Sequence, residues 1–181
     1  CARVSTAADL REILIAAAGE FGEFSTADLA AVIDGQDFTG DAVAELEASL
    51  RAAEGTGPLT PAAAVGAAFR GVFQECVDWH GAHGPMPGFR ELSRTLERVA
   101  FGPPPVTARR LLELIHVGVV DTQFLRAPEQ IDTWREEGGV DVLIDATVAP
   151  QAIPSPFHDV PGVVEIGRMN ELSLPGHDSL N

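Results

Sequence analysis

Cysteine is scarce in this 181-residue chain, and lysine and tyrosine are absent. It contains two cysteines, Cys1 and Cys76, and neither lysine nor tyrosine, so arginine supplies all twelve basic side chains. Two cysteines are too few for the disulfide framework that stabilises small secreted domains. The cysteine content therefore fits a reducing compartment, and we expect a cytoplasmic protein.

Long apolar runs are also missing from the sequence. Hydrophobic residues make up 45% of the chain, but no run approaches the ~18 uninterrupted apolar residues that indicate a transmembrane helix. The first residues do not combine a basic region with an apolar one, as an export signal does. The sequence therefore predicts a globular chain with its own core and no membrane partner.

Positive charge is scarce. The chain has 27 acidic residues against 12 basic ones, which gives a formal net charge of −15 at pH 7. A surface of this charge repels nucleic acid and anionic membranes rather than collecting them. We therefore expect no nucleic-acid partner.

Glycine motifs that bind nucleotides are absent as well. The chain has no Gly-x-Gly-x-x-Gly and no Gly-x-x-x-x-Gly-Lys-Ser/Thr segment, so it lacks the backbone amides that hold a pyrophosphate at the start of a helix. It opens with Cys1, and its only methionines are Met86 and Met169. We expect a piece of a longer polypeptide, whose missing N-terminal half is then a partner of this chain.

Helix signals fill residues 1–118. Apolar stripes of helical spacing alternate there with N-cap residues and with glycine or proline stops. The expected starts are Thr6, Ser25, Asp41, Thr60, Phe89 and Thr107, and the expected ends are Gly19, Gly35, Gly55, Trp79, the "FGPPP" segment and Gly118. The sequence thus predicts a helix-rich region of about six helices.

From residue 119 the hydrophobic period changes to that of strands. The expected strands are "VVDTQFL" (119–125), "VDVLIDATV" (140–148) and "VVEIGR" (163–168), and "PEQIDTWREEGG" (128–139) is expected to be a short acidic helix or loop. Residues 119–181 therefore form the second, strand-containing part of a predicted α/β chain.

Three potential metal ligands stand close together near the end of the fourth predicted helix. Cys76, His80 and His83 follow each other at i, i+4 and i+7, and on a continuous helix they would share a face, as a small metal-dependent hydrolase requires. Gly81 and Gly84 are expected to end the helix before His83 aligns. We therefore predict no metal site, and histidines that face the negative end of the helix dipole.

The closing strands resemble a strand pair of flavoproteins that bind two dinucleotides. In those proteins one hydrophobic strand runs into Ala-Thr-Gly, and a later one ends in Gly-Asp beside the flavin. "DVLIDATV" and "PGVVEIGR" are similar to this pair, with Val148 in place of the glycine and Arg168 in place of the aspartate. With "FRELSRTLERVAFGPPPVTARRLLELIHVGVVDTQFL" and "IGRMNELSLPGHDSLN", they make the chain from about residue 60 onward similar to the C-terminal half of the bacterial FAD/NAD(P)-binding protein family.

This resemblance implies a fragment of an FAD/NAD(P)-binding oxidoreductase whose C-terminal strands complete a Rossmann-like FAD domain. NAD(P)H would reduce the flavin, the substrate would be an unknown small molecule, and the fragment alone is expected to be inactive. The residues implied near the FAD are Asp145, Ala146, Thr147, Gly167, Arg168, Glu171 and Asp178. Arg168 and Glu171, three residues apart, could equally form a structural ion pair.

A second hypothesis treats the chain as a non-enzymatic helical interaction module. Its acidic face would bind a basic partner, and the closing strands would serve only for packing. Such a module should fold and function as the isolated chain, whereas a flavoprotein fragment should need the missing half.

Overall fold

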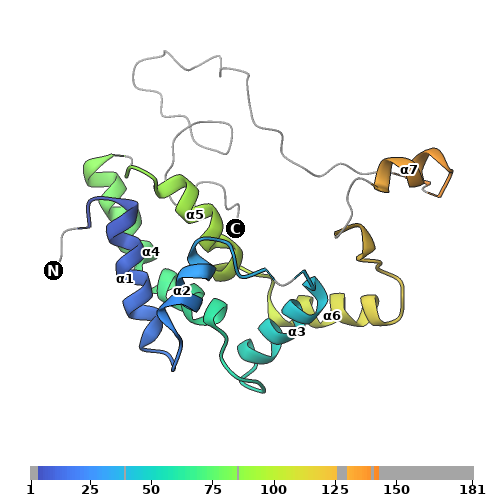
Figure 1. Cartoon of the computed structure of the whole chain (residues 1–181), viewed down its shortest axis with the longest axis horizontal. Coiled ribbons are helices and arrows are strands. Elements are labelled where there is room, and N and C mark those ends of the chain that lie inside the picture. Colours follow the sequence, from blue (N-terminus) through green and yellow to red (C-terminus); the bar gives the residue numbers. More distant parts are fainter. Residues whose placement is uncertain (1–3, 39, 85, 126–129, 140, 143–181) are drawn as a thin grey trace, which may run out of the picture.

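The computed structural model describes residues 4–142 except 39, 85, 126–129 and 140 (Figure 1). Within those residues the chain forms seven α-helices and one short 3-10 helix, and no strand. None of these helices is long and apolar enough to cross a membrane.

The first two helices begin at the N-caps that the sequence predicts. Helix α1 (Ala7–Gly19) opens with a capping box, in which the Thr6 hydroxyl accepts from the Asp9 amide and the Asp9 carboxylate accepts from the Thr6 amide. Helix α2 (Thr26–Ile33) follows Ser25, whose hydroxyl accepts from the amide of Asp28. Both predicted starts are confirmed.

The next two helices are capped in the same way. Asp41 caps helix α3 (Ala42–Ala53), and Thr60 caps helix α4 (Pro61–His83), whose first residue is a proline. At 23 residues, α4 is the longest helix described. It ends at Gly84, which adopts a φ of 80° that favours glycine.

Four further elements follow. Helix α5 (Phe89–Ala100) and helix α6 (Pro105–His116) are joined by the predicted proline-rich break, and α6 begins two residues before Thr107. The 3-10 helix η1 (Gln123–Leu125) and helix α7 (Gln130–Glu136) come last. Of the short helix and the loop that the sequence left open for residues 128–139, the structure has the helix.

The core lies among α1, α2, α4 and α5, which pack together, with α4 against each of the other three. Its buried side chains come from all four helices and include Leu10, Leu14, Leu29, Val32, Ile33, Val65, Phe69, Phe89 and Leu96. Figure 1 shows these helices gathered in one body. Burial of these apolar side chains is the main term that stabilises this body.

Helices α3 and α6 form a separate pair beside that body (Figure 1). Each packs mainly on the other, and α3 also touches α4. No residue of α3 is buried, and α6 buries only Ala108 and Leu112. This pair therefore has a much thinner core than the four-helix body.

The predicted α/β fold class is wrong for the residues that the structure describes, because they are helical throughout and contain no strand. The strand expected at residues 119–125 is also wrong. The amides of Val119 and Val120 both donate to the carbonyl of Leu114 and close the end of α6, and η1 then begins at Gln123. The strands expected at 140–148 and 163–168 lie outside the described residues, apart from Asp141 and Val142.

The predicted end of α4 at Trp79 is wrong by one turn. The helix continues through Gly81 to His83. His80 is buried there and helps to hold the last turn in place, which outweighs the low helix propensity of a single glycine.

Candidate functional site

His80 links the last turn of α4 to the segment before α5. It is 2% exposed, and its Nδ1 lies 2.8 Å from the carbonyl oxygen of Cys76, so this nitrogen carries a proton and donates. Its Nε2 then accepts from the backbone amide of Met86 at 3.4 Å. Phe89 packs edge-on against the ring, with 4.6 Å between centroids. Both ring nitrogens are thus used in structural contacts.

His83 lies one turn further along and faces Trp79. The two rings stack with 4.9 Å between centroids and 21° between planes. The Nδ1 of His83 donates to the carbonyl of Trp79 at 3.0 Å. The stacked pair forms a flat wall at the end of α4.

Cys76, His80 and His83 share a continuous helix, contrary to the prediction that Gly81 ends it. Their polar atoms do not converge, since His80 bonds to backbone groups and His83 stacks on Trp79. No group of three or more His, Cys, Asp or Glu side chains that could hold a metal ion is found in the part of the chain that the structure describes.

A groove runs between α1 and α4. Its volume is about 710 Å³, within the ~300–1,000 Å³ that is usual for ligand sites. It is lined by Val4 and Ser5, by Leu10 and Ile13 of α1, by Val72, Glu75, Cys76, Trp79 and His83 of α4, and by Met86. We call this the α1–α4 groove, and most of its lining is apolar.

Acidic side chains border the α1–α4 groove. Glu75 belongs to its lining, and Asp9 accepts hydrogen bonds from the amide and hydroxyl of the lining residue Ser5. These bonds lower the pKa of Asp9, with the Ser5 amide as the largest cause, so Asp9 is negative at neutral pH. Glu12 and Asp78, next in sequence to Ile13 and Trp79, do not line the groove: Glu12 lies 3.6 Å from Arg11, and Asp78 accepts from the side-chain amide of Gln74.

The arginines of α1 and α4 are turned to other elements. Arg11 donates to Asp34, at the end of α2, with 2.7 Å between Nη2 and Oδ2, and this bond holds the pKa of Asp34 below its usual range. Arg70 donates to the carbonyl of Ala100 at the end of α5. Arg11 also lies 3.6 Å from Glu12 of its own helix. Neither arginine lines the groove, whose lining includes the carboxylate of Glu75.

Cys76 lies at the base of the α1–α4 groove with only 4% of its surface exposed. Burial raises the pKa of its thiol to about 11, and the negative charge of Glu75 adds to this effect. A thiol with this pKa is protonated and weakly nucleophilic at neutral pH. Cys76 is therefore part of the apolar lining and is no candidate for a catalytic thiolate.

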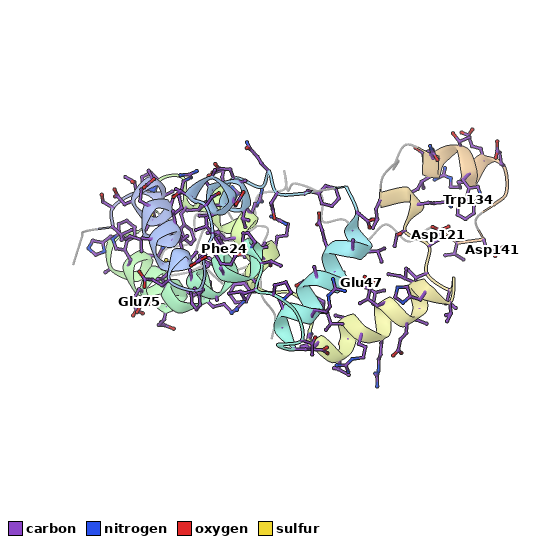
Figure 2. The ribbon with its side chains drawn as sticks, turned by 60° about the horizontal axis from the view of Figure 1, so that its bottom comes forward. Phe24, Glu47, Glu75, Asp121, Trp134 and Asp141 are labelled. Carbon is purple, nitrogen blue, oxygen red and sulfur yellow. The ribbon has the colours of Figure 1, made fainter. Side chains whose placement is uncertain are left out.

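Glu75 belongs to the four-helix body, whereas Trp134 and Asp141 lie on the segment around α7 (Figure 2). The residues implied near the FAD come later in the chain. Asp145, Ala146, Thr147, Gly167, Arg168, Glu171 and Asp178 all lie outside the described residues. The groove residues instead come from the helical region, and they include Cys76 and His83, which the sequence analysis considered as metal ligands.

No family model, curated protein or solved structure matches this chain.

Proposed function

We propose that this chain is a protein-interaction module that binds a basic amphipathic helix in the α1–α4 groove. One observation carries the proposal: the groove has a mostly apolar lining that includes the carboxylate of Glu75 and no arginine, and Asp9 is bonded to its lining residue Ser5. An amphipathic helix with leucines on one face and basic residues beside them has the complementary pattern.

The apolar lining supplies the contact surface for such a helix. Leu10 and Ile13 on α1 face Val72 and Trp79 on α4 across the groove. Grooves between two helices commonly take the apolar face of a third helix, which places side chains at i, i+3, i+4 and i+7 in them. Large aromatic side chains such as Trp79 tend to contribute most of the binding energy at such contacts.

The carboxylates supply orientation and specificity. Glu75 lies in the groove itself, and Asp9 of α1 is bonded to the lining residue Ser5. A net charge of −15 raises the association rate of a basic partner at low salt and repels an acidic one. One acid on each of the two helices favours a partner helix with several basic residues over a ligand with a single positive charge.

A fluorescence titration tests this proposal. The Trp134→Phe variant leaves Trp79 as the only tryptophan, so its emission reports on the groove. The probes are a synthetic leucine–lysine amphipathic helix and its leucine–glutamate counterpart. We expect saturable binding of the lysine peptide, and binding at least about tenfold weaker, or ~1.4 kcal/mol, for the glutamate peptide.

Paired variants localise the binding. Glu75→Arg is expected to weaken binding of the lysine peptide at least about fivefold, whereas Glu23→Arg, the same change in the exposed segment between α1 and α2, changes it less than about twofold. Equal affinities for the two peptides, or equal effects of the two variants, would contradict the proposal.

Flavin-dependent NAD(P)H oxidation is our second proposal, and only the sequence resemblance supports it. It depends on Asp145, Ala146, Thr147, Gly167, Arg168, Glu171 and Asp178. The ultraviolet–visible spectrum of protein purified from the complete reading frame tests it. Flavin bands would support the proposal, and a colourless protein that gains none with added FAD would rule it out.

A further inference from the structure

His83 places a titratable ring in the lining of the α1–α4 groove. It is the last residue of α4 and is exposed. Its ring stacks on Trp79, another lining residue, with 4.9 Å between centroids and 21° between planes. The stack holds a flat imidazole in the wall of the groove, where a partner that binds there would meet it.

One nitrogen of this ring is free to take up a proton. Nδ1 lies 3.0 Å from the carbonyl oxygen of Trp79 and donates to it, so the uncharged ring carries its proton on Nδ1. Nε2 is then the basic nitrogen, and it has no hydrogen-bond partner within the part of the chain that the structure describes. Protonation of Nε2 breaks no contact there, and an imidazolium is attracted to the face of an indole ring. His83 thus keeps its place in the lining in both charge states.

The neighbouring His80 differs from His83 in both respects. It is 2% exposed and does not line the groove, and both of its nitrogens are bonded to backbone groups. A proton on its Nε2 would displace the amide of Met86. His83 is therefore the histidine of α4 that can change its charge without breaking a contact.

Among the described residues, the other titratable groups along this groove are Glu75 and Cys76 of α4 and Asp9 of α1, which is bonded to Ser5. Burial raises the pKa of the Cys76 thiol to about 11, so this thiol stays neutral. The Ser5 amide is the largest cause that lowers the pKa of Asp9, which stays negative. Histidine is the side chain that ordinarily changes its charge between about pH 5 and 8. His83 therefore makes the charge of the lining depend on pH in this range.

Protonation of His83 adds a positive charge to a lining that otherwise carries the carboxylate of Glu75. The two residues lie eight positions apart on α4, which is about 12 Å along the helix axis. A basic helix long enough to cover both residues meets an attractive charge at Glu75 and, after protonation, a like charge at His83. Like charges that face each other across an interface disfavour binding.

We propose that His83 determines whether the α1–α4 groove accepts a basic helix. The groove binds the helix while the imidazole is neutral, and its affinity for the helix falls when Nε2 takes up a proton. This inference rests on the function proposed for the groove and adds a dependence on pH to it. By the same linkage, a bound basic helix opposes the protonation of His83.

Isothermal titration calorimetry with the leucine–lysine peptide at low ionic strength tests this proposal. For the wild-type 181-residue chain, we expect a dissociation constant at least about threefold higher at about pH 5.5 than at about pH 8. His83→Gln cannot take up the proton, so its dissociation constant should change less than about 1.5-fold. His83→Arg carries a positive charge at both pH values, and it should bind at least about threefold more weakly than the wild-type chain at about pH 8.

His116→Gln is the matched control, because it removes a histidine outside the groove. His116 lies on α6, with 3.0 Å between its Nε2 and Oε1 of Glu47 on α3. This variant should keep the pH dependence of the wild-type chain. His83 and His116 are both exposed, so all three variants should give the helical circular-dichroism signal of the wild-type chain.

The outcomes separate this inference from the function proposed for the groove. Binding that weakens at the lower pH in the wild-type chain and in His116→Gln, but not in His83→Gln, supports the inference. Binding by the wild-type chain that does not change with pH, or that weakens equally in His83→Gln, would overturn the role of His83 and leave the proposed function standing. No binding of the peptide at either pH would overturn both.

Discussion

His80 is a buried polar side chain whose two nitrogens connect α4 with the segment leading to α5. It donates to the carbonyl of Cys76 and accepts from the amide of Met86, and its ring packs on Phe89. Removing the ring leaves the Met86 amide without a partner in a buried place and opens a cavity beside Phe89. Both effects destabilise a folded protein.

We therefore predict that His80→Ala lowers the free energy of unfolding by about 3 kcal/mol, measured by urea denaturation. His83→Ala, one turn away on the same helix, is the matched control. His83 is exposed and contacts mainly Trp79, so its loss should lower this free energy by less than about 1 kcal/mol. Equal losses would contradict the structural role given to His80.

Cys76 gives a prediction about alkaline pH. Its pKa rises from an ordinary value of 9.0 to about 11 on folding, because burial disfavours the thiolate and Glu75 adds a negative charge nearby. The folded chain thus holds this proton more tightly than the unfolded chain between these two pH values. The contribution of the protonated Cys76 thiol to the free energy of unfolding is fully present below pH 9 and is lost as pH rises through 11.

The absence of lysine and tyrosine makes this effect measurable. In a Cys1→Ser chain, Cys76 is the only side chain with an ordinary pKa between 9 and 11. We expect its free energy of unfolding to fall across this range by up to about 3 kcal/mol, at ~1.36 kcal/mol per pKa unit. The Cys1→Ser/Cys76→Ala chain should show a flat profile, and a matching slope in both chains would contradict the burial of the thiol.

At the scale of the elements, the most extensive helix contact is between α4 and α5. Gly66 lies in the second turn of α4, where a Cβ atom would collide with the backbone carbonyl of Val99 on α5. Backbone cannot move aside as a flexible side chain can, so this position needs a residue without a side chain. The contact fixes how closely the two helices approach.

Gly66→Ala should therefore lower the free energy of unfolding by about 1–3 kcal/mol despite the better helix propensity of alanine. Gly71→Ala lies on the same helix, with no atom within 4 Å of the added Cβ. It should raise the free energy of unfolding by about 0.5–1 kcal/mol. Thermal and urea denaturation measure both values, and a stabilising Gly66→Ala would contradict the close approach of α4 and α5.

The starts of the helices could be predicted from the sequence much better than their ends. The strand predicted from the change of hydrophobic period at residue 119 was also wrong. The capping signals at Thr6, Ser25 and Thr60 act within four residues, so local sequence contains the whole cause. The end of α4 depends on burial of His80 against the distant Phe89. Residues 119–125 alternate as a strand does, but in the described structure they follow α6 and find no partner strand.

At the scale of the whole molecule, the described residues form a four-helix body and a second, thinner pair of helices. The candidate site lies on the body, along the seam of α1 and α4. Leu10 and Ile13 belong to one of the apolar stripes of helical spacing that the sequence predicts in residues 1–118. A stripe does not reveal whether a neighbouring helix covers it. The residues of α4 that face Leu10 and Ile13 are set by the packing of two helices some sixty residues apart in the chain. No local sequence pattern encodes this packing.

One titration tests the central claim, that a basic amphipathic helix binds in the α1–α4 groove, most directly. It compares Ile13→Asp with the Trp134→Phe parent chain, using the leucine–lysine peptide and Trp79 fluorescence. Ile13→Asp adds a negative charge and places it on the apolar wall of the groove. If the peptide is held only by attraction to an acidic surface, its affinity should rise. If its apolar face inserts into the groove, its affinity should fall.

We predict that Ile13→Asp weakens binding at least about tenfold, or ~1.4 kcal/mol, because the apolar face of the peptide would meet a desolvated carboxylate. An unchanged or higher affinity would show that the peptide is attracted by charge alone, and it would contradict the function proposed for the groove.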